Sequence, residues 1–158
     1  MDHYADSSFL VSCYVVNANT PQAKAWLSSN SVPLAFTALH ALEVRNACKL
    51  GVFRGLFAAA DAAAAWRNLE SDLRSGRLVK TIVKWPVVFR VATRLADAHS
   101  MTTGTRSLDI LQVAAAKAAR AAEFLSFDAR QRTLASAVVS APGSVSRPTD
   151  PATHANGA

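Results

Sequence analysis

Four of the eleven acidic side chains stand at positions where catalysis could use them. Asp6 follows a short run at residues 3–5, and Asp128 follows another at residues 123–127, each typical of a β-strand. Either carboxylate could simply cap the helix that comes next, a contribution of about 1 kcal/mol to stability. Parallel strands, however, place their carboxyl ends at one edge of a sheet, so the two side chains could also share a site.

Glu43 lies in a helix that the sequence pattern predicts over residues 38–50. At 100° per residue, it falls on an apolar arc of that helix together with Leu39, Leu42, Asn46 and Leu50. A carboxylate on a core-facing arc is costly to desolvate unless a cation meets it. Two interpretations follow: a buried ion pair with an arginine, or a place in a shared acidic site.

Asp109 lies in the first turn of a helix expected to begin near Ser107, where its charge would also suit the helix dipole. Gathered in one place, four carboxylates would repel one another and take up protons unless a divalent cation kept them ionised. Oxygen-only ligands favour Mg²⁺ or Mn²⁺. Such an ion polarises a phosphodiester and lowers the pKa of a bound water, which is the chemistry of a metal-dependent nuclease.

The overall charge suits a polyanionic partner such as nucleic acid. Seventeen Lys and Arg residues against eleven Asp and Glu residues make a net charge of +6, and the pI is near 9.9. Ordinary solubility charge is the alternative explanation. Two cysteines are too few for a disulfide framework or a Cys-based zinc site. The first residues lack the basic segment of a secretory signal, and no apolar run approaches the ~20 residues of a membrane span, so we expect a cytoplasmic protein.

Short β-like runs alternate with helical patterns over residues 1–140, which predicts a single α/β domain with a mostly parallel central sheet. Strands are expected at residues 3–5, 34–36, 78–83 and 123–127. Helices are expected after a cap at Ser7 or Ser8, from Pro21, and over residues 38–50, 56–75, 86–99, 107–121 and 129–139. Residues 141–158 hold three prolines and almost no bulky apolar side chains, which predicts a disordered C-terminal tail.

Four segments of the chain resemble, in order, the motifs of the PIN domain, a family of metal-dependent nucleases. They are YADSSFLV with Asp6, FTALHALEVRNAC with Glu43, RSLDILQVAAA with Asp109 and AEFLSFDARQRTLA with Asp128, and together they span residues 4–137. The resemblance implies a three-layer α/β/α sandwich with a parallel sheet and one acidic pocket.

The same resemblance implies roles for individual residues. The ligands of Mg²⁺ or Mn²⁺, direct or through water, would be Asp6, Glu43, Asp109 and Asp128. The last of these would support a second ion or hold a water. Ser126 and Ser8 would orient the pocket by hydrogen bonding. The family often has a histidine where this chain has Gln112, a change that affects local hydrogen bonding more than metal ligation.

A single PIN domain of this length looks most like a VapC-type toxin of a bacterial toxin–antitoxin pair. That resemblance implies an endoribonuclease, a cognate antitoxin that blocks the pocket, and a homodimer. Three arginines near the predicted site are best placed to meet RNA phosphates through salt-dependent, charge-assisted bonds: Arg106, Arg130 and Arg132. A solvated helix surface is the alternative for each.

The sequence thus supports a Mg²⁺-dependent endoribonuclease as the first hypothesis. The competing hypothesis is a basic α/β module of the same fold that binds RNA or a protein partner without cutting.

Overall fold

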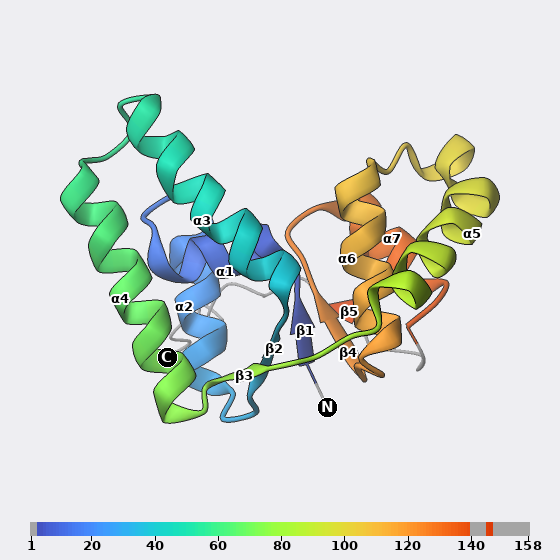
Figure 1. Ribbon diagram of the computed structural model, residues 1–158, viewed down its shortest axis with the longest axis horizontal. Coiled ribbons are helices and arrows are strands. Elements are labelled where there is room, and N and C mark those ends of the chain that lie inside the picture. Colours follow the sequence, from blue (N-terminus) through green and yellow to red (C-terminus); the bar gives the residue numbers. More distant parts are fainter. Residues whose placement is uncertain (1–2, 140–144, 147–158) are drawn as a thin grey trace, which may run out of the picture.

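The structure confirms the predicted α/β architecture. The computed structural model describes residues 3–139 and 145–146, and its strands form one sheet in which every described pairing is parallel. The strands are β1 (His3–Ala5), β2 (Leu34–Phe36), β3 (Leu78–Lys80), β4 (Glu123–Leu125) and β5 (Val145–Ser146). Their spatial order is β3-β2-β1-β4-β5 (Figure 1).

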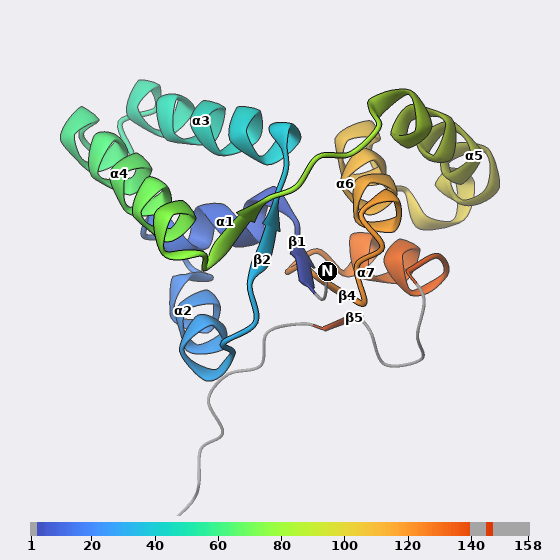
Figure 2. The same ribbon diagram turned by 60° about the horizontal axis from the view of Figure 1, so that its bottom comes forward.

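Helices cover the two faces of this sheet in two groups, which makes the fold a three-layer sandwich (Figures 1 and 2). One group is α1 (Ser7–Tyr14), α2 (Thr20–Ser29), α3 (Ala38–Phe53) and α4 (Ala59–Ser75). The other group is α5 (Trp85–Thr103), α6 (Ser107–Ala118) and α7 (Ala129–Ser136). Each strand-to-strand connection therefore crosses over through helices, as parallel pairing requires.

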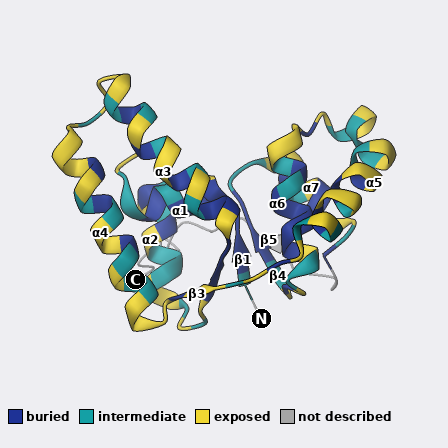
Figure 3. Cartoon of the chain, viewed as in Figure 1, coloured by how far each residue is buried: buried dark blue, intermediate teal, exposed yellow. Residues whose placement is uncertain are grey.

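Successive strand residues enter two different cores. Tyr4 of β1 and Phe124 of β4 pack with α5, α6 and α7, whereas Ala5 and Leu125 pack with α1 and its neighbours. This alternation follows from the two-residue period of a strand. Because both faces of the sheet are covered, the last two residues of β1 and of β4 are apolar and buried, while His3 and Glu123 at their starts pair with each other. Figure 3 shows the buried residues on the inward side of each helix.

Most helices differ from the prediction by one to four residues at an end. Asp6, and neither Ser7 nor Ser8, caps α1: its carboxylate accepts a hydrogen bond from the N–H of Phe9 at 2.7 Å. The expected end of α3 at Gly51 is wrong, since the helix continues to Phe53. The expected strands at residues 78–83 and 123–127 are likewise shorter, because the chain leaves the sheet after β3 and β4.

Gly51 serves close packing and does not end the helix. A Cβ built at this position would lie 2.1 Å from the Cζ atom of Phe57, so the ring occupies the space that any side chain would need. Glycine thus lets the Phe57 ring lie directly against α3, and a side chain at this position would have to shift that ring.

The predicted tail at residues 141–158 lies outside the described residues, except for the two that form β5. β5 pairs in parallel with β4, with Phe124 opposite Val145. In the part of the chain that the structure describes, no helix is both long and apolar enough to cross a membrane.

We expect Gly51→Ala to lower the free energy of unfolding by about 1–2 kcal/mol, because overpacking against Phe57 outweighs the better helix propensity of alanine. Urea denaturation measures the change. In a Phe57→Ala background the same substitution should be neutral or stabilising, by up to about 1 kcal/mol. An equal loss in both backgrounds would show that the ring does not cause it.

Candidate functional site

The predicted acids lie near the point where the order of strands in the sheet reverses, between β1 and β4. From β1 the chain first winds outward to β2 and β3, and it then returns to the other side of β1 to form β4. Helices leave β1 and β4 toward opposite faces of the sheet. Open α/β sheets bind ligands at such a point, outside the carboxyl ends of the strands, and we call this place the crevice. Asp6 follows β1 directly, and its N–H donates to the carbonyl of Leu125 at 2.9 Å, so it lies beside the end of β4.

Asp6 is the most buried of the four acids, with 3% of the residue exposed. Besides capping α1, its carboxylate accepts from the hydroxyl of Ser8, which lies 2.9 Å from both oxygens. The hydroxyl of Ser126 lies 2.9 Å from Oδ2. Burial raises the pKa of Asp6 to about 6; the Phe9 N–H and the two hydroxyls act against this rise, and the charge of Asp109 adds to it.

Asp109 is tied to this group by Gln131, a buried residue of α7 that sequence reasoning missed. The Nε2 atom of Gln131 donates to Oδ1 of Asp109 at 3.0 Å, while its Oε1 lies 2.8 Å from the Ser126 hydroxyl. That hydroxyl has one proton and shares it between Asp6 and Gln131. A signal existed in the sequence: Gln131 stands three residues after the cap Asp128, a capping-box spacing. Packing against α6 turns the amide toward Asp109 instead.

Glu43 also joins the crevice, from α3. Its Oε2 accepts from the hydroxyl of Ser7 at 2.8 Å and from Nε2 of Gln112 on α6. Gln112 in turn accepts from the hydroxyl of Tyr4 at 2.8 Å. Gln112 therefore holds Glu43 across the two helix layers.

The predicted arc around Glu43 is wrong, although its inward position is right. Leu42 is 65% exposed and Asn46 is exposed, because α3 packs on α1 and α4 through another face. That face consists of Leu39, His40, Val44, Cys48 and Gly51. Among the residues that the structure describes, no arginine forms an ion pair with Glu43, contrary to one of the two interpretations. Arg45 lies over the ring of Trp66, 3.9 Å from its centroid.

His40 of α3 holds the end of β1 in place through a hydrogen bond to Ala5. Its Nε2 lies 2.8 Å from the carbonyl of Ala5, and its Nδ1 accepts from the N–H of Thr37 at 3.0 Å. Burial lowers the pKa of His40 to about 4, so the ring is neutral at physiological pH and donates through Nε2. The residue just before Asp6 is thereby held in place by α3.

Asp128 stands at the border of the crevice. Its Oδ1 caps α7 by accepting from the N–H groups of Arg130 at 2.7 Å and Gln131 at 3.4 Å. Partial burial acts to raise the pKa of Asp128, but the hydrogen bonds and charge of Arg130 hold it below its ordinary value. The structure thus joins Asp6 and Asp109 through Ser126 and Gln131, holds Glu43 in a separate set of hydrogen bonds with Ser7 and Gln112, and leaves Asp128 as a capping residue.

The three predicted RNA-contacting arginines occupy different environments. Arg106 pairs with Asp109 at 3.3 Å, and Arg130 pairs with Asp128 at 3.4 Å. Arg132 donates to the carbonyl of Ser126 at 3.0 Å, so it supports the loop that follows β4.

The donor set suits a hard divalent cation. Every polar group that reaches the acids is a hydroxyl, an amide or an arginine, and the carboxylates supply oxygen ligands only. Burial, together with the charge of Asp109, raises the pKa of Asp6. A bound cation would lower this pKa again, because it stabilises the ionised carboxylate. Among the described residues, no three Asp, Glu, His or Cys side chains already form a cation-binding group. Asp6, Glu43 and Asp109 could hold an ion if hydrogen-bond partners gave way.

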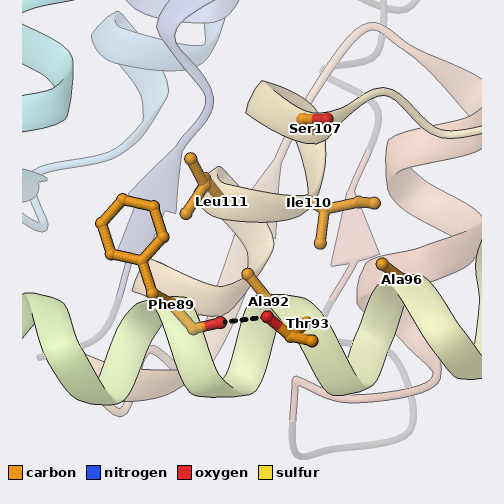
Figure 4. Close-up of a pocket in the computed structure, with 7 residues that line it drawn as sticks. All are labelled: Phe89, Ala92, Thr93, Ala96, Ser107, Ile110 and Leu111. Atoms are coloured by element: carbon orange, nitrogen blue, oxygen red, sulfur yellow. Dashed lines mark hydrogen bonds between the residues drawn. The ribbon is translucent and has the colours of Figure 1, made fainter.

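A separate hollow lies between α5 and α6 (Figure 4). Its cavity of about 190 Å³ is lined by Phe89, Ala92, Thr93, Ala96, Ser107, Ile110 and Leu111. The hydroxyl of Thr93 donates to the carbonyl of Phe89 at 3.0 Å. Since this lining has no titratable side chain, the acidic crevice is the better candidate for chemistry.

No protein-family model matches the chain, and no curated protein matches it. The candidate site therefore rests on geometry and on the sequence motifs.

We expect Asp6 to make the free energy of unfolding fall as the pH rises from about 4 to about 6. The folded protein binds this proton more tightly than the unfolded chain, so the stabilisation is complete below the ordinary pKa of 3.8 and is lost above about 6. Asp6→Asn removes the titration. The unfolding free energy of the wild type minus that of the variant should fall by up to about 3 kcal/mol between pH 4 and pH 7.

Urea denaturation in EDTA at several pH values measures this difference. Asp97→Asn, on the exposed side of α5, is the matched control and should show little pH-dependent difference. A flat profile for Asp6→Asn would mean that the carboxylate of Asp6 is hydrated in the folded protein.

Proposed function

We propose that this chain is a divalent-cation-dependent endoribonuclease of PIN type. The observation that supports this best is the convergence of Asp6, Glu43 and Asp109, from β1, α3 and α6, at the crevice between β1 and β4. These residues lie far apart in the chain. Ser126 and Gln131 link Asp6 to Asp109. Glu43 bonds to Ser7, the residue after Asp6, and to Gln112, which lies on the same helix as Asp109.

The carboxylates of this crevice would hold Mg²⁺ or Mn²⁺, with Asp128 at its border. A bound ion of this kind supplies Lewis acidity toward a phosphodiester and a water of lowered pKa. Ser126 and Gln131 orient Asp6 and Asp109, while Ser7 and Gln112 orient Glu43. Hydrolysis by an activated water needs no side chain as covalent nucleophile, and the serines here are engaged as hydrogen-bond donors.

RNA as substrate is supported by the net charge of +6 and by two arginines next to the acids, Arg106 and Arg130. Acidic side chains repel phosphates, so a basic surface must offset them. The resemblance to VapC-type toxins extends the proposal to a role in a toxin–antitoxin pair. A cognate antitoxin and a homodimer belong to that extension.

A non-catalytic module that binds RNA or a protein is the second candidate. The hydrogen bonds that already occupy the carboxylates favour it, since they satisfy the acids without a cation. This candidate predicts RNA binding that survives the loss of any one acid.

We expect the purified protein to cleave single-stranded RNA with Mg²⁺ or Mn²⁺, and EDTA to abolish the cleavage. Asp109→Asn should lower the rate by at least about a hundredfold, because it removes a cation-binding charge but keeps the shape. Asp97→Asn should cleave like the wild type. Undiminished cleavage in EDTA or in Asp109→Asn would reject the proposed mechanism.

We also expect millimolar MnCl₂ to raise the melting temperature of the wild type by roughly 5–10 °C, because a ligand of the folded state stabilises it. The shift should be small in Asp6→Asn and in Asp109→Asn and unchanged in Asp97→Asn. Differential scanning calorimetry measures it. The absence of a wild-type shift would favour the non-catalytic module.

A further inference from the structure

Two of the four acids are paired with an arginine from the start of their own helix. Arg106 stands at the N-cap position of α6 and meets Asp109, whereas Arg130 lies in the first turn of α7 and meets Asp128. We propose that both guanidinium groups occupy these carboxylates only in the cation-free protein. A divalent cation displaces them, and they then turn toward RNA phosphates. This inference rests on the proposed cation site and RNA substrate.

A cation at Asp109 must compete with the partners that its two oxygens already have. Oδ1 accepts from Nε2 of Gln131, and Oδ2 accepts from the backbone N–H and from Nε of Arg106, both at 3.3 Å. Gln131 is 3% exposed and also contacts Ser126, so displacing it would disturb the buried network. The Arg106 side chain is 75% exposed. Exposed ion pairs are weak, so Arg106 is the partner that gives way.

Arg130 makes a similar outer contact. Its Nη2 lies 3.4 Å from Oδ2 of Asp128, its side chain is 52% exposed, and its Nη1 lies 3.5 Å from the carbonyl of Gly104. Gly104 begins the short loop that ends at Arg106. The two guanidinium groups are therefore associated with one loop at the rim of the crevice.

Because the arginines and the cation are both positive, binding of the cation and binding of RNA should depend on each other. In the cation-free protein the arginines offset two outward carboxylates, and a bound divalent cation would repel a guanidinium only a few ångströms away. Once released, each planar guanidinium can bind a phosphate through two parallel hydrogen bonds. Cation binding should therefore raise the affinity for RNA, and RNA should raise the affinity for the cation by the same factor.

The first experiment measures cation binding without RNA. Isothermal titration of MnCl₂ should show roughly three- to tenfold tighter binding for Arg106→Gln than for the wild type, because the competitor is gone. Arg106→Lys, which keeps the charge but not the planar fork, should fall between them. Arg67→Gln, on the exposed side of α4, is the matched control and should bind as the wild type does.

The second experiment observes the displacement in the wild type. In a ¹H–¹⁵N spectrum, the Nε–H signal of Arg106, identified by its loss in Arg106→Lys, should move to the position of solvated arginines as MgCl₂ saturates the protein. A signal that stays in place at saturation would overturn the inference. Only the identification of the signal uses a variant; the displacement itself is observed in the wild type.

The third experiment measures binding of a 2′-O-methyl RNA oligonucleotide by fluorescence anisotropy. With Mg²⁺, Arg106→Gln and Arg130→Gln should each bind roughly three- to tenfold more weakly than the wild type, and without Mg²⁺ the difference should nearly vanish. An equal loss under both conditions would show that the arginines are free before the cation binds, and would overturn the exchange.

The outcomes separate this inference from the proposed function. If the wild type binds no Mn²⁺, both fail. If it binds Mn²⁺ but Arg106→Gln binds with the same affinity and the Arg106 signal does not move, only the exchange fails. Tighter Mn²⁺ binding by Arg106→Gln together with an absence of RNA cleavage would support the exchange and reject the nuclease.

Discussion

The buried carboxylate of Asp6 is the constraint on which the rest of the site depends. This carboxylate caps α1, and its residue lies beside the end of β4. Its burial carries a desolvation cost that two hydroxyls and a backbone N–H only partly offset. The ionised form of such a buried carboxyl lowers the stability of the fold, and groups with pKa values shifted in this way cluster at functional sites. The position follows from topology, because the junction of β1 and β4 is where connections leave toward opposite faces.

Two neutral amide side chains hold carboxylates of the site in place without adding charge. Gln112 reaches from α6 to Glu43 on α3, and Gln131 reaches from α7 to Asp109 on α6. An amide can donate to a carboxylate and accept from a hydroxyl at once, so it orients the acid without neutralising it. The arginines differ, because they add charge, sit at the surface and can move. The crevice thus combines a fixed inner set of contacts with an exchangeable outer set.

Much of this arrangement could be predicted. The short β-like runs before Asp6 and Asp128 predict β1 and β4, and the last two residues of each strand are apolar and buried because both faces of the sheet are covered. The arc assigned to Glu43 was wrong, since periodicity locates an apolar stripe but not the face that packs. The predicted helix stops one residue before Gly51, whereas α3 continues past it. The reason for a glycine there is the ring of Phe57, which lies in a connection that has no periodic signal.

By itself, the sequence determined the order of strands and helices and the placement of an acid after β1 and after β4, because local patterning and capping act within a few residues. Only the tertiary structure decided which side chains hold those acids. Ser126 and Asp6 are 120 positions apart, and Gln112 and Glu43 are 69 apart. Such hydrogen bonds require atoms within about 3 Å, and how helix layers pack on a sheet is set by the whole core rather than by any one segment.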